Sequence, residues 1–514
     1  MKMRNVLEGV GAALLLFPYY LPFFHPQNHD LYYHGLPVTN LIGGLLVDLL
    51  GCSILVTGFL VALPHLPSTP RKVVEALFPG LMLWSIVEFA IQGIRLQHPI
   101  EYWEIKWERS ALPILLVSGV LAYFIPRAAQ PLVRAIRFAL ASLAFSALWI
   151  VPQLIYLALL STPVHGAAVA HLTAPANNGS RRIIWILFDE LSYDQTFEHP
   201  AAGIELPNFD RLRAASISFS NLKPIGYETS RIIPSLFTGA SFEEFRSTID
   251  GRLSYKDESQ RRWTAYDANA SLFGVAQQNG WNTGADGWFI PYCGILGSAV
   301  NVCYRDSGIL LPMEEFGASE KMSVLANAAI VPNQFLAALT QKKKSLANQH
   351  IETYETVMAH TQVLIDDQQI RFVFLHLPVP HPPGIFDRQR HALRPGGDYL
   401  DNLVLADDTL GTLMREIDAT ASASQTTVVV TSDHSWRIRL WKSAGDWSAE
   451  QERVSGGKFD DRPVLLVHFP RQDSGQDVHA ALSEMIEHDM IADMLRGQIN
   501  NQEDLASYLS QHSR

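Results

Sequence analysis

Residues 183–189 read Ile-Ile-Trp-Ile-Leu-Phe-Asp, six consecutive apolar residues followed by a carboxylate. The segment Arg182–Phe188 consists of these six apolar residues and the arginine before them. It is typical of a strand that is buried on both faces of a parallel sheet. Further strands are expected at Ser216–Leu222, Arg371–Leu377, Thr426–Thr431 and Pro463–Phe469, and helical patterns alternate with them at Pro207–Ala215, Ser230–Phe237, Ala270–Asn279, Tyr399–Ile417 and His479–Arg496. This alternation predicts an α/β domain over residues 181–514, in which helices sandwich a mainly parallel sheet.

The first third of the chain differs, because long apolar runs dominate residues 1–165. Five spans of a membrane are expected there, at about Val6–Phe24, Leu41–Leu63, Val73–Ile94, Ala111–Ile125 and Phe138–Leu160. Lys and Arg are more frequent in the short loops on the side of the N-terminus, which predicts a cytoplasmic N-terminus. If five spans in residues 1–165 are followed by a linker at 166–180, the α/β domain at 181–514 would then lie outside the cytoplasm.

Charge and cysteine usage set further limits on partners and compartment. The net charge of −11 argues against a nucleic-acid partner, which would need a basic surface. Cys293 and Cys303 lie close together in the second half of the chain. In an oxidising compartment they could form a disulfide that closes a small loop, and two free thiols are the alternative.

Polar residues follow several of the expected strands where each strand ends. Asp189 follows the first strand, His381 comes a few residues after Arg371–Leu377, and Asp433 and His434 come soon after Thr426–Thr431. Ligands of parallel α/β sheets bind beyond the carboxyl ends of the strands, so these side chains are expected to converge on one edge. Thr229, at the start of an expected helix near its N-cap, is the hydroxyl that could join them.

This combination of side chains predicts a site for one or two divalent metal ions. Oxygen and nitrogen ligands without thiolates favour Zn or Mn, with Mg or Ca as alternatives. Asp189, Asp433 and His434 are the expected ligands, and Thr229 would bind through its hydroxyl. A metal lowers the pKa of such a hydroxyl, and the helix N-terminus adds positive potential, so Thr229 is the predicted nucleophile. Phosphoryl groups are the natural electrophile for this chemistry.

Two histidines and an arginine complete the predicted site. His381 is expected to act in catalysis, for instance by protonating a leaving alkoxide, and His376 is expected to bind substrate. Arg231, close to Thr229, could pair with a phosphate, and a structural or solvated role is its alternative. Glu190 is either a further metal ligand or a residue that supports Asp189.

These motifs, in this order, resemble the sulfatase-like branch of the alkaline phosphatase superfamily. The resemblance covers roughly Arg181–Leu495. Its carriers are Ile-Leu-Phe-Asp189-Glu, Thr229-Ser-Arg-Ile-Ile-Pro-Ser-Leu-Phe-Thr-Gly239, His376-Leu-Pro-Val-Pro-His381-Pro-Pro, Tyr399-Leu-Asp-Asn-Leu-Val-Leu-Ala-Asp407 and Thr431-Ser-Asp433-His434. Expected spans before such a domain also look like bacterial phosphoethanolamine transferases and lipoteichoic acid synthases.

The resemblance implies an alkaline-phosphatase-like α/β/α sandwich in a multi-pass protein of the cytoplasmic membrane, with the catalytic domain on the extracytoplasmic, periplasmic side. It also implies a phospholipid donor and an envelope glycan or lipid acceptor, with a phosphoalcohol group of phosphoethanolamine or phosphoglycerol type passing through a phosphothreonine intermediate.

One departure from the family favours phosphoryl transfer over sulfate-ester hydrolysis. Sulfatases oxidise a Cys or Ser to formylglycine, and Thr229, with its β-methyl group, cannot give that aldehyde. A membrane-anchored hydrolase of phosphoric or sulfuric esters is the alternative function. A third hypothesis is a catalytically silent domain that binds an envelope polymer, and the complete set of metal ligands argues against it.

Overall fold

The computed structural model describes residues 3–21, 39–97, 113, 117, 120, 124, 126–160, 181–247, 253–257, 259, 261–304, 322–330, 346–443, 447–456 and 458–512. The chain divides into two compact units. One comprises Met1–Val164 and Leu310–Lys344, and the other comprises His165–Ile309 and Ser345–Arg514. The sequence did not predict that residues 310–344 join the first unit. The predicted boundaries at 165 and 180 stay predictions.

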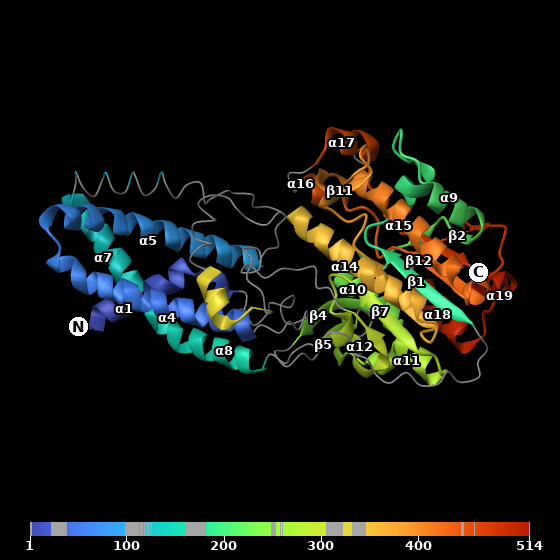
Figure 1. The fold of residues 1–514 in the computed structure, drawn as a ribbon, viewed down its shortest axis with the longest axis horizontal. Coiled ribbons are helices and arrows are strands. Elements are labelled where there is room, and N and C mark those ends of the chain that lie inside the picture. The colour runs from blue at the N-terminus through green and yellow to red at the C-terminus, as the bar shows by residue number, and fades with distance from the viewer. Residues whose placement is uncertain are drawn as a thin grey trace. The chain divides into compact units, whose positions relative to one another are not determined.

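The first unit is helical. Its main helices are α1 (Met3–Leu16), α4 (Thr39–Ala62), α5 (Ser68–Gln97), α7 (Pro126–Leu143) and α8 (Ala147–Leu160), as Figure 1 shows. Helix α1 approaches α7 so closely at Gly11 that a Cβ atom there would collide with the carbonyl oxygen of Leu140. Glu8 is buried on α1 and forms ion pairs of 2.7 Å with Arg4 and 2.8 Å with Arg137. A buried carboxylate is tolerated here because two guanidinium groups compensate its charge.

Two helices among the described residues, Thr39–His65 and Val133–Leu159, are long and apolar enough to cross a membrane. The prediction of about five spans is therefore wrong for the described part of the chain. Helix α1, where the first expected span begins, ends at Leu16 after 14 residues, which is about 21 Å of helix against about 30 Å of hydrocarbon. The third, Val73–Ile94, lies in α5 and carries two carboxylates. Most of the fourth, Ala111–Ile125, lies outside the described residues.

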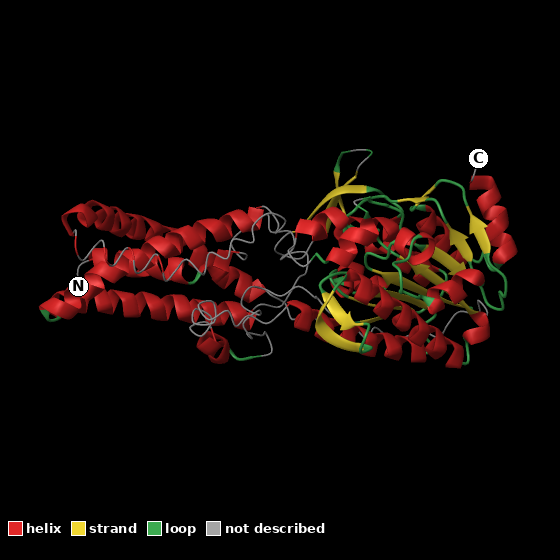
Figure 2. Cartoon of the chain, turned by 90° about the horizontal axis from the view of Figure 1, so that it is seen from above, coloured by secondary structure: helices red, strands yellow, loops and turns green. Residues whose placement is uncertain are grey.

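A sheet forms the centre of the second unit (Figures 1 and 2). It has eight strands in the order β14-β2-β13-β12-β1-β9-β7-β8. In that order the strands are Gln476–Val478, Ile217–Phe219, Leu465–His468, Thr426–Thr431, Arg182–Phe188, Phe372–Leu377, Thr283–Gly287 and Val302–Cys303. Strand β1 pairs in parallel with both β12 and β9. Strand β13 runs antiparallel to β12 and β2. The prediction of an α/β domain with a mainly parallel sheet is confirmed.

Helices cover both faces of this sheet because side chains alternate along β1. Ile184, Ile186 and Phe188 belong to the core that includes residues of α9 (Pro207–Ala214), α14 (Leu346–Asp366) and α15 (Tyr399–Ala419). On the other face, the ring of Trp185 lies 5.8 Å from that of Phe237 on α10 (Thr229–Thr238). Further α-helices described in this unit are α11 (Leu272–Gln278), α12 (Tyr292–Leu296), α16 (Ile438–Ser443), α17 (Ala449–Ser455), α18 (Ile486–Arg496) and α19 (Gln502–His512).

Short strands account for two differences from the expected elements. The helix expected over His479–Arg496 begins at Ile486, because β14 pairs with β2 and β15 (Leu482–Ser483) pairs with β3 (Leu222–Lys223). For the same reason the strand expected at Ser216–Leu222 is divided into β2 and β3. Three further strands, β4 (Phe242–Ser247), β5 (Leu253–Asp257) and β6 (Trp263–Ala265), form a small sheet, and β10 (Gly384–Asp387) pairs with β11 (Ala392–Gly397).

Candidate metal centre

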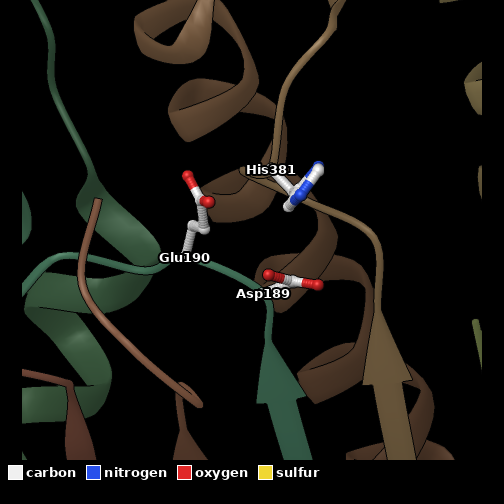
Figure 3. A group of neighbouring side chains, drawn as sticks. All are labelled: Asp189, Glu190 and His381. Carbon is white, nitrogen blue, oxygen red and sulfur yellow. The ribbon is translucent and has the colours of Figure 1, made fainter. Parts of the chain in front are cut away.

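Strand β1 ends in two buried carboxylates, Asp189 and Glu190 (Figure 3). Glu190 has a φ of 66°, in the left-handed region that non-glycine residues rarely adopt. This turn directs its backbone N–H to Oδ1 of Asp433, at 3.2 Å. Backbone strain of this kind persists where the surrounding structure holds it, and it concentrates at functional sites. The turn thus ties the end of β1 to the loop after β12.

Thr229 lies beside Asp433 and His434, the two side chains that follow β12. Its Oγ1 donates a hydrogen bond to Oδ2 of Asp433 at 2.6 Å and lies 3.3 Å from Nε2 of His434. All three side chains are buried. Glu228 is the N-cap residue of α10, so Thr229 is the first residue of the helix rather than its cap. The hydroxyl is therefore at the positive end of the helix, as the sequence predicted.

The electrostatics of this group favour positive charge. Burial raises the pKa of Asp433, but the charge and hydrogen bond of His434 and the hydrogen bond from Thr229 together hold it below its usual range. Burial lowers the pKa of His434, but Asp433 outweighs this effect and the net shift is upward. Both directions are those of a site in which carboxylates stay ionised and attract a cation.

His376 is held in one tautomer by its neighbours. Tyr292 is fully buried, and burial together with the charges of Asp433, Asp189 and Asp286 raises its pKa, so its hydroxyl keeps its proton. That hydroxyl lies 2.6 Å from Nδ1 of His376, which therefore accepts the hydrogen bond. The proton of the neutral ring is then on Nε2, which faces Oδ2 of Asp189 at 3.4 Å. His376 is fully buried, and its Nε2 makes no hydrogen bond to the residues that the structure describes. Its predicted contact with substrate stays a prediction.

His381 lies on the loop after β9 and is partly exposed (Figure 3). Its Nε2 is 3.2 Å from an Nη atom of Arg437. Arg437 also forms an ion pair with the carboxylate of Glu190, which accepts hydrogen bonds of 2.7 and 3.0 Å from Nε1 of Trp441. Arg437, Trp441 and Tyr292 were not among the residues predicted from the sequence. The place of Arg437, four residues after Asp433, was the one available signal.

Arg231 makes different contacts from those predicted. Its guanidinium donates to the carbonyl oxygen of Phe242 at 3.1 and 3.2 Å, linking α10 to β4. Within the described ranges, no hydrogen bond or ion pair joins it to the other predicted site residues. This geometry is that of the structural alternative, and a contact between Arg231 and substrate stays a prediction.

The residues present fit a divalent cation. Asp189, Asp433 and His434 each offer one ligand atom, and these atoms lie within 4.8 Å of one another. Oδ1 of Asp189 is buried and accepts no hydrogen bond from any residue that the structure describes. A buried carboxylate oxygen without a donor is costly unless a cation compensates it. Carboxylate and imidazole ligands of this kind suit Zn or Mn.

A mainly parallel sheet with acidic, histidine and hydroxyl groups at the carboxyl ends of its strands is the arrangement of alkaline-phosphatase-like enzymes. Residues 181–492 match the family model described as Sulfatase. The match spans more than half of the chain, and the chain belongs to the sulfatase family. This bears out the resemblance found in the sequence motifs. No curated protein matches the sequence.

Several solved structures are similar to the chain. One is the lipoteichoic acid synthase LtaP from Listeria monocytogenes, at 11% identity and a TM-score of 0.39, covering 63% of this chain and 75% of that one. Another is the phosphonate monoester hydrolase of Agrobacterium radiobacter, at 13% identity and a TM-score of 0.36, covering 62% and 74%. Murine ectonucleotide pyrophosphatase/phosphodiesterase 5 shares 12% identity at a TM-score of 0.35, covering 62% and 95%. At these values the likenesses carry no argument about the reaction.

Proposed function

We propose that this protein is a membrane-anchored, metal-dependent phosphotransferase. It moves a phosphoalcohol group, of phosphoethanolamine or phosphoglycerol type, from a phospholipid to an envelope glycan or lipid. The observation that carries the proposal is the placement of the Thr229 hydroxyl, which lies 2.6 Å from Oδ2 of Asp433 and 3.3 Å from Nε2 of His434 at the start of α10. A threonine cannot supply the formylglycine of sulfate-ester hydrolysis, but it can attack phosphorus.

Asp189, Asp433 and His434 would hold the divalent ion, with Thr229 as the fourth group. When bound, the ion supplies positive charge that stabilises the alkoxide form of a nearby hydroxyl and the oxygens of a transferring phosphoryl group. The protein's own contribution is positional: Asp433 accepts the hydrogen bond of the Thr229 hydroxyl and fixes the direction of Oγ1. The N-terminus of α10 adds favourable potential at the same oxygen.

The reaction consists of two displacements. In the first, Oγ1 of Thr229 bonds to phosphorus and its proton passes to water, and the phosphorus–oxygen bond to diacylglycerol breaks. The diacylglycerol oxygen takes up a proton from water. The acid role predicted for His381 stays a prediction, because Nε2 of this ring accepts a hydrogen bond from Arg437. In the second, a hydroxyl group of the acceptor bonds to phosphorus and the bond to Thr229 breaks. The proton of the acceptor passes through water to Oγ1, which restores the threonine.

Hydrolysis is the alternative outcome of the same covalent step, and the family assignment favours keeping it as the second candidate. In that reaction a water molecule replaces the acceptor hydroxyl, and the product is a free phosphoalcohol. The two functions share Thr229 and its partners, so they differ in the second displacement alone. An assay with and without an acceptor lipid separates them.

Two features support a location at the membrane with the catalytic unit outside the cytoplasm. Two helices in the described residues are long and apolar enough to cross a membrane. Cys293 and Cys303 form a disulfide, one of the two alternatives for this pair, and disulfides persist in oxidising compartments. The multi-pass topology and the periplasmic orientation belong to this proposal.

The test is the mass of the protein after contact with phospholipid. The full-length chain, purified in detergent and loaded with Zn²⁺ or Mn²⁺, is incubated with vesicles of phosphatidylethanolamine or phosphatidylglycerol. We expect an adduct with the mass of the transferred phosphoalcohol on the peptide that contains Thr229, together with released diacylglycerol. Diacylglycerol release without any acceptor, at the rate seen with one, would support the hydrolase. Absence of bound metal would support the silent binding domain.

A further inference from the structure

A second group of potential metal ligands lies beside the first. Asp189, Glu190 and His381 each offer one ligand atom, and these atoms lie within 4.8 Å of one another (Figure 3). Asp189 belongs to both groups, and its buried Oδ1 accepts no hydrogen bond from the described residues. By composition this second group could hold another divalent ion, as the sequence analysis allowed.

Arg437 already contacts two of these three ligands. Its Nε atom pairs with Oε1 of Glu190, and one of its Nη atoms lies 3.2 Å from Nε2 of His381. A guanidinium group only donates hydrogen bonds, so Nε2 of His381 accepts. The proton of that neutral ring is then on Nδ1, which faces the carbonyl oxygen of Pro382. The lone pair that a metal would need on His381 is thus directed at Arg437.

The charges of the buried groups also argue against a second divalent ion beside Arg437. Asp189, Glu190 and Asp433 are at most 1% exposed, so three negative charges are buried together. One divalent ion and the guanidinium of Arg437 balance them. Two divalent ions beside Arg437 would leave an excess of two positive charges, and uncompensated buried charge is strongly unfavourable. The planar guanidinium is always charged and can bind a carboxylate and a second acceptor at once.

We infer that Arg437 is the resident cation of a second cation position formed by Asp189, Glu190 and His381. This inference rests on the proposed function, because it takes the Asp189–Asp433–His434 group as the site of the first ion. The wild-type protein then binds one divalent ion, and removing Arg437 converts the second group into a metal site. Trp441 continues to hold the Glu190 carboxylate in place when Arg437 is removed.

The experiment counts metal ions in the full-length protein. The wild-type chain and Arg437→Ala are dialysed against excess Zn²⁺, and bound zinc per chain is measured by elemental mass spectrometry. We expect one ion in the wild type and two in Arg437→Ala. The double variant Arg437→Ala/Glu190→Gln should return to one, because it removes the carboxylate of the new site. Arg439→Ala, an exposed arginine on α16, is the matched control and should keep one ion.

The possible counts separate this inference from the proposed function. Two ions in the wild type, or one in Arg437→Ala, would overturn the role of Arg437 and leave the phosphotransferase proposal standing. No ion in the wild type would instead remove the metal centre on which both rest. If the circular dichroism signal shows that Arg437→Ala does not fold, Arg437→Gln takes its place, because it keeps most of the length of the side chain without its charge. The same counts of bound zinc then test the role of Arg437.

Discussion

The hydroxyl of Thr229 lies 2.6 Å from Oδ2 of Asp433, although 204 residues separate the two along the chain. The contact joins the start of α10 to the loop that follows β12. Both side chains are buried, and burial in a site of low dielectric strengthens a hydrogen bond to a carboxylate. A hydroxyl fixed in this way has one direction in which to attack, which is the basis of its predicted role.

Replacing Thr229 by alanine should abolish turnover. A loss on the order of 10³-fold or more is expected, because removing a covalent nucleophile leaves the contribution of binding and electrostatics alone. The measurement is diacylglycerol release from phospholipid vesicles by the full-length protein. Thr229→Ser, which keeps the hydroxyl, should retain the covalent adduct. Ser230→Ala is the control, since this neighbouring hydroxyl makes no described contact with Asp433. Near-wild-type turnover by Thr229→Ala would sink the nucleophile assignment.

Replacing Tyr292 by phenylalanine should weaken metal binding without removing a ligand. The change deletes the hydrogen bond to Nδ1 of His376, so the position of this ring, whose Nε2 lies 3.4 Å from Oδ2 of Asp189, is no longer fixed. Loss of such supporting hydrogen bonds typically costs about 10- to 100-fold in metal affinity. Competition between the protein and a chelator for Zn²⁺ measures the change. Tyr354→Phe, which loses a hydrogen bond to Thr409, is the control and should leave zinc affinity unaltered.

The closeness of Asp189, Asp433 and Thr229 could be predicted because the position of each is fixed by a local rule. Asp189 and Asp433 follow parallel neighbouring strands, and such strands end at the same edge of a sheet. Thr229 begins a helix, and that position carries positive potential whatever the tertiary contacts. These two rules, applied to the sequence alone, predict that the side chains lie near one another.

The supporting residues could not be predicted because their contacts depend on how short elements fold back. Arg437 precedes α16 and Tyr292 begins α12, and neither helix shows an apolar period long enough to orient it from sequence. The number of membrane helices was overestimated because apolar composition was read without knowing where helices end. Helix α1 ends at Leu16, and Pro18, two residues further on, is the sequence signal of that boundary.

Stability of the α/β unit should depend on pH through Glu487. Burial raises the pKa of this carboxyl from 4.5 to about 8, against the opposing hydrogen bond from Thr431. Between these values the folded state holds a proton that the unfolded state releases. The stabilisation is therefore complete below about pH 4.5 and is lost as the pH rises toward 8.

Glu487→Gln stays neutral at every pH and should be more stable than the wild type at pH 8.5, with the difference shrinking toward pH 5. Thermal unfolding of the full-length protein, followed by circular dichroism at both pH values, measures this difference. Glu503→Gln, on an exposed side chain of α19, should show no such dependence. An equal difference for Glu487→Gln at pH 5 and pH 8.5 would contradict the assignment.

The disulfide between Cys293 and Cys303 should stabilise the edge of the sheet. It joins α12 to β8 across a separation of ten residues, and Tyr292, the partner of His376, directly precedes it. Breaking a bridge of this kind typically costs about 2–4 kcal/mol, because the unfolded chain gains conformational freedom. Cys303→Ser should therefore lower the unfolding midpoint, and reductant should lower the wild type but not the variant. Cys52→Ser, at the one free cysteine, should respond to reductant as the wild type does. Alkylation of the denatured, unreduced chain should modify Cys52 alone, and modification of all three cysteines would show that the bridge does not form.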